Sequence, residues 1–157
     1  MKVDIVVKVG VQTMKKAKKP NPPAKAAFLN VDLDIESTAK LDLLVTEMGD
    51  AVSVLYCGVY GRPRRNHLHL ETSRYYRAPD VTIHALCGIV ERLSPAGRQV
   101  WDAAVGKEFN VGYDLRPTER CSSFSLRTRT LQRISSLGAT LGVTYYRGVT
   151  GGEQKPA

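Results

Sequence analysis

Residues 28–36 read FLNVDLDIE, and this stretch decides the fold class of the chain. Apolar side chains occur at every second position from Leu29 to Ile35, and the positions between them are acidic or amide residues. A period of two is typical of a strand that has one buried face and one exposed face. The stretch therefore predicts a strand in a sheet with one covered face and one acidic face.

The residues that follow this strand carry the period of a helix. The apolar residues between Leu41 and Met48 fall on one side of that helix, and Gly49 is a suitable residue to end it. Alternating patterns return around residues 52–56 and 67–72, with a basic turn between them. These two runs predict a β-hairpin.

The second half of the chain predicts further helices and strands. Residues 79–93 have helical spacing, and Ser94 and Pro95 begin a second helix, because serine caps a helix and proline fits its first turn. Trp101 lies on the apolar stripe of that helix and is expected in the core. The remaining segments predict a strand at 109–113, a short strand at 124–126, a helix at 131–137 and a strand at 141–145.

The predicted order from residue 28 is β-α-β-β-α-α-β-β-α-β. Strand-helix-strand units at both ends predict an α+β fold, ferredoxin-like or a duplicated split β-α-β. We expect a mostly antiparallel or mixed sheet with its helices on one face. The chain divides into a basic arm or linker at 1–27, a single α+β domain at 28–148 and a flexible tail at 149–157.

The net charge of +8 is concentrated in the arm, because residues 1–27 hold seven lysines and one acid. Prolines and lysines at 14–25 predict a linker. Ahead of it, residues 3–11 alternate with period two. They are either an extra N-terminal strand or an extension before a natural start at Met14.

Composition limits the class of protein. A chain of 157 residues is the size of one domain, and no stretch reaches the roughly 20 apolar residues that cross a bilayer. Without a secretion-signal pattern, we expect a cytoplasmic protein. Cys57, Cys87 and Cys121 are widely spaced, which favours reduced thiols over a disulfide framework or a zinc knuckle.

Several segments carry a family resemblance. They are FLNVDLDIES at 28–37, VWDAA at 100–104, FNVGY at 109–113, SFSL at 123–126 and LQRISSLGATLGVTYY at 131–146. The last three resemble the C-terminal signature of an uncharacterised family of bacterial domains of unknown function, and the first two are similar to its members. The resemblance spans residues 28–147 and implies a fold family without a known activity. Its likeness to compact bacterial immunity-type proteins is one of size and style.

His67, His69 and Glu71 are the only metal candidates that we single out, because they share one face of a strand. Successive same-face positions lie about 7 Å apart, which is wide for one metal ion. The simpler interpretation is that Leu68 and Leu70 face the core while the three polar residues coat the other side. We therefore expect no metal and no cofactor.

Neither a nucleophile elbow nor a phosphate-binding loop occurs, so no catalytic residue is predicted. Arginine beside tyrosine suits phosphate contact and base stacking. The candidate nucleic-acid or anion contacts are Arg62, Arg64, Arg65, Arg74, Tyr75, Tyr76 and Arg77.

The sequence favours a noncatalytic protein-interaction module of the bacterial immunity or regulatory type. Its partner would be another protein, or a second copy bound through a sheet edge. One alternative is a nucleic-acid-binding accessory protein that uses the lysine arm and the arginine-rich hairpin. Another is an enzyme or metal-binding protein that uses the strand of His67, His69 and Glu71. A membrane partner is not expected.

Overall fold

The structure is a computed structural model that describes residues 5–9, 27–115 and 124–147. The lysine run of the arm, Cys121 and the tail at 149–157 lie outside the described residues. In chain order the elements are β1 (Ile5–Val9), β2 (Ala27–Ser37), α1 (Asp42–Met48), the 3-10 helix η1 (Gly49–Ala51), β3 (Val52–Tyr60), β4 (Arg65–Thr72), α2 (Pro79–Glu91), α3 (Pro95–Ala103), β5 (Gly106–Leu115), α4 (Thr128–Ser136) and β6 (Thr140–Arg147).

The strands form one mixed sheet in the order β1-β6-β5-β2-β4-β3. β2 lies antiparallel to β4 and β5, and β3 lies antiparallel to β4. β6 runs parallel to both β5 and β1. A parallel neighbour requires a crossover, which α4 supplies between β5 and β6. The α+β class and the mixed sheet predicted from the sequence are confirmed.

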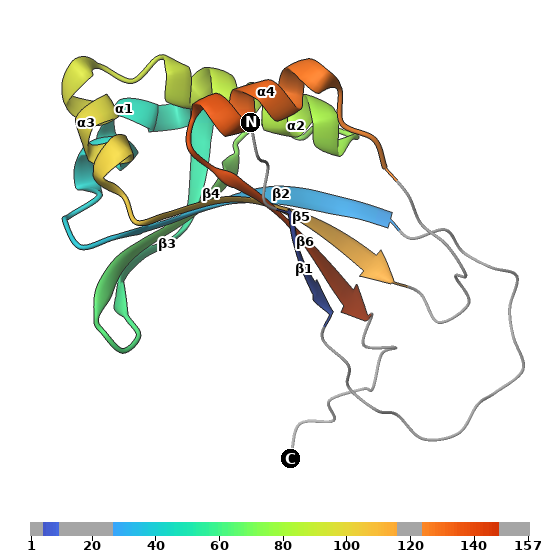
Figure 1. Ribbon diagram of the computed structural model, residues 1–157, viewed down its shortest axis with the longest axis horizontal. Helices are drawn as coiled ribbons and strands as arrows, with labels where there is room; N and C mark the ends of the chain where they lie inside the picture. The colour runs from blue at the N-terminus through green and yellow to red at the C-terminus, as the bar shows by residue number, and fades with distance from the viewer. Residues whose placement is uncertain (1–4, 10–26, 116–123, 148–157) are drawn as a thin grey trace, which may run out of the picture.

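The four α-helices cover one face of this sheet, and none of the described helices covers the opposite face, which we call the open face (Figure 1). The alternation in β2 sets the two faces, because Val31, Leu33 and Ile35 are buried while the residues between them are only partly buried. The core lies between the covered face and the helices. Its fully buried large side chains include Leu33, Phe109, Ile83, Leu86, Trp101 and Ile134.

Two local predictions have clear outcomes. Ser94 caps α3, since its hydroxyl oxygen accepts a hydrogen bond from Gly97 N at 3.1 Å, and Pro95 occupies the first turn. Trp101 is fully buried, and its indole Nε1 donates to the Leu137 carbonyl oxygen at 2.9 Å. Both predictions are confirmed.

The short strand predicted at 124–126 is wrong, because residues 124–127 form neither strand nor helix. The place beside β5 is taken by β6, which pairs with it from Glu108 to Leu115. Phe124 and Leu126 pack against the core instead, with the Phe124 ring stacked on Tyr113 at 5.7 Å between centroids. Their alternation therefore reflects burial of side chains and not strand pairing.

Residues Ile5–Val9 form the edge strand β1, which pairs with β6 from Leu141 to Tyr145. Part of the segment assigned to the arm thus belongs to the main sheet. Strand formation is one of the two alternatives that the alternating pattern left open.

Candidate functional site

The open face of the sheet is strongly acidic. We define the open face by the side chains of Asp32, Asp34, Glu36, His67, His69, Glu71 and Glu108. Strand register brings them together: Asp34 lies between His69 on β4 and Glu108 on β5, and Glu36 lies beside His67. Carboxylates from three strands therefore share one surface, which is where the acidic side of the β2 pattern was expected.

Burial and the neighbouring carboxylates together perturb the pKa of Asp32. Partial burial raises its pKa to about 6, and the negative charges of Asp34 and Glu71 add to the rise. Asn30 Nδ2 donates to Asp32 Oδ1 at 2.7 Å and to Glu71 Oε2 at 3.1 Å, which partly offsets the repulsion. The negative charge of Asp32 is therefore held at a cost in stability.

The predicted metal candidates share this face but do not converge. His69 uses both ring nitrogens, Nδ1 at 2.6 Å from Asp34 Oδ1 and Nε2 at 3.1 Å from the Tyr60 hydroxyl. The His67 ring lies parallel to it, with centroids 6.2 Å apart. Across the described residues, no group of three or more histidine, cysteine, aspartate or glutamate side chains is arranged to hold a metal ion.

Hydrogen bonds link Tyr60, His69 and Asp34 in series, and their order of donors and acceptors resembles that of a catalytic relay. These residues border a shallow hollow of about 300 Å³ on the open face. Partial burial and the charge of Asp34 raise the pKa of the Tyr60 phenol, so the phenol stays protonated at neutral pH and is a weak nucleophile. The Tyr60 ring also stacks on His67 at 3.6 Å between centroids. These contacts fix the β3–β4 hairpin against β2.

The arginine and tyrosine candidates fall into two separate groups. Arg62 and Arg64 lie in the turn between β3 and β4, and Arg65 Nε pairs with Glu36 Oε1 at 3.0 Å. The segment from Arg74 to Arg77 follows the other end of β4. At about 3.3 Å per residue, the eight-residue strand separates the two groups by roughly 20 Å or more. The seven side chains therefore lie in two groups at opposite ends of β4 and do not converge on one point.

Sequence reasoning missed the exposure of β3. This strand ends the sheet order, so β4 is its only strand neighbour among the described residues. Its nine residues, VSVLYCGVY, contain no charged side chain. Five large side chains on it are more than 40% exposed: Val54, Leu55, Tyr56, Val59 and Tyr60. We call residues 52–60 the β3 edge, and the absence of charge is the signal that could have identified it.

Comparison of the chain with protein-family models, curated proteins and solved structures found no match. None of the helices in the described ranges is long and apolar enough to span a membrane.

Proposed function

We propose that the protein is a noncatalytic protein-interaction module that binds an extended segment of a protein partner along the β3 edge. The observation that carries the proposal is a nine-residue edge strand without a charged residue whose large apolar side chains are exposed. The partner segment would bind by adding a strand to the sheet beside β3. Backbone hydrogen bonds would then supply affinity, and neighbouring side chains would supply specificity.

The physical reason lies in the unpaired backbone of an edge strand. Its free N–H and C=O groups pair readily with any other strand, so natural edges are protected by charged residues, proline or bulges. β3 has one such feature, an irregularity between Val54 and Tyr56. Beyond it, the run from Tyr56 to Tyr60 is regular and uncharged, which leaves five residues for pairing.

The open face beside this edge supports a positively charged partner. Asp34 and Glu36 lie two strands in from the β3 edge, and His67 on β4 lies between. Lysine or arginine side chains on the partner strand would be attracted to these carboxylates, which gives orientation and a faster encounter. The same charges would repel a phosphate backbone, so nucleic acid fits this surface poorly.

We also assign the region from β2 to β5 to a ferredoxin-like arrangement. Its element order β2-α1-β3-β4-α2-β5 and its strand order β5-β2-β4-β3 support this assignment, to which α3, α4, β6 and β1 are additions. Binding without chemistry on such a scaffold suits a bacterial immunity or regulatory role, and that role is part of the proposal.

A capture experiment with a matched control tests the proposed function. Tagged wild-type protein, Val59→Lys and Val81→Lys would be incubated with a lysate of the source cell, with and without nuclease. Val59 and Val81 are both 44% exposed, but Val81 lies on α2. A lysine at residue 59 adds a charge to the edge, whereas a lysine at residue 81 leaves β3 unchanged.

We expect a nuclease-resistant protein that wild type and Val81→Lys retain and Val59→Lys loses. The amides of β3 should then exchange more slowly with deuterium in the isolated complex. Equal retention by Val59→Lys would contradict binding at the β3 edge. Loss of the partner on nuclease treatment would favour the nucleic-acid alternative.

A further inference from the structure

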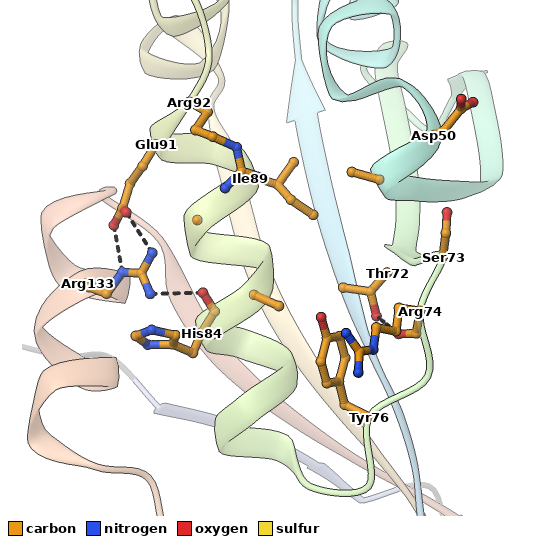
Figure 2. A pocket seen from close by; sticks show the side chains of 13 residues that line it. Asp50, Thr72, Ser73, Arg74, Tyr76, His84, Ile89, Glu91, Arg92 and Arg133 are labelled. Atoms are coloured by element: carbon orange, nitrogen blue, oxygen red, sulfur yellow. Dashed lines mark hydrogen bonds and ion pairs between the residues drawn. The ribbon is translucent and has the colours of Figure 1, made fainter.

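A second surface feature lies on the helix side of the sheet. It is a groove of about 610 Å³ between α2 and the segment that follows β4, with one wall completed by α4. We call it the arginine groove and define it by Arg74, Tyr76, His84, Gly88, Arg92 and Arg133. Figure 2 shows these arginines approaching the groove from three different parts of the chain.

Arg133 is held in place from α2. Its Nε and Nη2 donate to Glu91 Oε1 at 2.7 Å and to Glu91 Oε2 at 2.6 Å, and its Nη1 donates to the His84 carbonyl oxygen at 2.9 Å (Figure 2). This paired contact raises the pKa of Arg133 and lowers that of Glu91. The guanidinium is therefore rigid and its charge is balanced.

The Arg92 side chain also approaches Gly88, but in the part of the chain that the structure describes it has no carboxylate partner of the kind that Glu91 provides for Arg133. A Cβ atom built on Gly88 would lie 3.4 Å from Arg133 Nη2 and 3.5 Å from Arg92 Nη1, so these two nitrogens are at most about 7 Å apart. Within the residues that the structure describes, no carboxylate forms an ion pair with Arg92 or with Arg74. Arg92 and Arg74 thus place two positive charges at the groove that have no ion-pair partner among the described residues.

Gly88 is an independent indication of a ligand. It lies inside α2, where glycine is less favourable than alanine. Its φ is not positive, and an added Cβ would make only van der Waals contacts with the two arginine side chains. Neither backbone conformation nor packing requires glycine at this position. A group that approaches the helix backbone between the two guanidiniums would require it.

We propose that the arginine groove binds a small phosphate monoester, with the phosphate over Gly88 between Arg92 and Arg133. A phosphate dianion would neutralise the charge of Arg92, and guanidinium forks suit its oxygens. Arg74, which also lines the groove, adds a second positive charge to it. Asp50 also lines the groove, but its carboxylate points away from the arginines (Figure 2).

The rest of the groove suits an apolar or planar organic group. Ile89 contributes an apolar wall, and the Tyr76 ring lies 5.5 Å from the Arg74 guanidinium carbon. An aromatic ring beside a guanidinium is a surface on which a planar base can stack. A 5′-mononucleotide therefore has the required chemistry and serves as the probe. This site is separate from the β3 edge, so it stands or falls independently of the proposed function.

Calorimetric titration of the full chain with AMP, inorganic phosphate and adenosine tests the proposal. AMP should bind most tightly, phosphate more weakly and adenosine at least tenfold more weakly than AMP, because a charge-assisted hydrogen bond contributes a factor of about ten or more. Arg92→Gln should weaken AMP binding about tenfold. Arg98→Gln, which removes an arginine paired with Asp102 on α3, should leave it unchanged.

Gly88→Ala gives the sharpest outcome. Alanine should weaken AMP binding about tenfold while leaving the thermal midpoint unchanged or higher, because helix propensity favours alanine. Wild-type affinity in this variant, or equal binding of AMP and adenosine, would overturn the proposal. So would an oligonucleotide that binds more tightly than AMP and is insensitive to Arg92→Gln.

Discussion

Asp32→Asn is expected to stabilise the protein at neutral pH. Asparagine has nearly the same shape, and it keeps the Oδ1 atom that accepts the hydrogen bond from Asn30 at 2.7 Å. The substitution removes only the negative charge that lies beside Asp34 and Glu71. Any change in stability then reports the cost of that charge on the open face.

The magnitude follows from the pKa of Asp32, which rises from its ordinary value of 3.8 to about 6. A rise of about two units corresponds to at most about 3 kcal/mol, and solvent screening of a partly buried group reduces it. The folded protein binds the carboxyl proton of Asp32 more tightly than the unfolded chain does. The contribution of Asp32 to the free energy of unfolding therefore falls as pH rises from about 4 to about 6. Above about pH 6 the destabilisation by the Asp32 charge is fully present.

Urea unfolding followed by circular dichroism, at pH values from 4 to 8, measures this effect. The stability of Asp32→Asn relative to wild type should be near zero at pH 4, rise through pH 6 and remain constant above it. Asp42→Asn, which removes a carboxylate from the start of α1 and away from the open face, should not gain stability over this pH range. A pH-independent difference, or a variant less stable than wild type at pH 7, would refute the reasoning.

Two further predictions concern the core. Trp101→Phe should lower the free energy of unfolding by about 1–3 kcal/mol, because the buried Leu137 carbonyl loses its donor; an unchanged urea midpoint would contradict this. The thiol of Cys87 is buried, and burial raises its pKa to about 12, so a thiol reagent should modify it only as fast as the protein unfolds. Mass spectrometry of the peptide that contains Cys87 measures this rate, and rapid labelling of the folded protein would count against its burial.

The open face shows which features a local sequence pattern can predict and which it cannot. Alternation in residues 28–36 predicted the acidic side of β2, and the period of β4 correctly placed His67, His69 and Glu71 on one face. What these residues contact was not predictable, because the partners of His69 come from β2 and β3. Strand register decides such contacts, and register depends on pairing between segments that are distant in the sequence.

The error at 124–126 has a related cause. Phe124 and Leu126 alternate as strand residues do, yet they pack on the core without pairing. A short alternating run indicates that two side chains are buried, and it does not say whether a neighbouring strand has room for it. Here β6 occupies that place as a parallel neighbour of β5, after the α4 crossover.

The sequence by itself determined the α+β class, the covered and exposed sides of β2 and the burial of Trp101, because side-chain periodicity within one element decides these features. Only the tertiary structure decided that β3 lies at the edge of the sheet and that Arg74, Arg92 and Arg133 border one groove. Strand order and the packing of α4 on α2 arise from contacts between distant segments, which leave no periodic signal in any one of them.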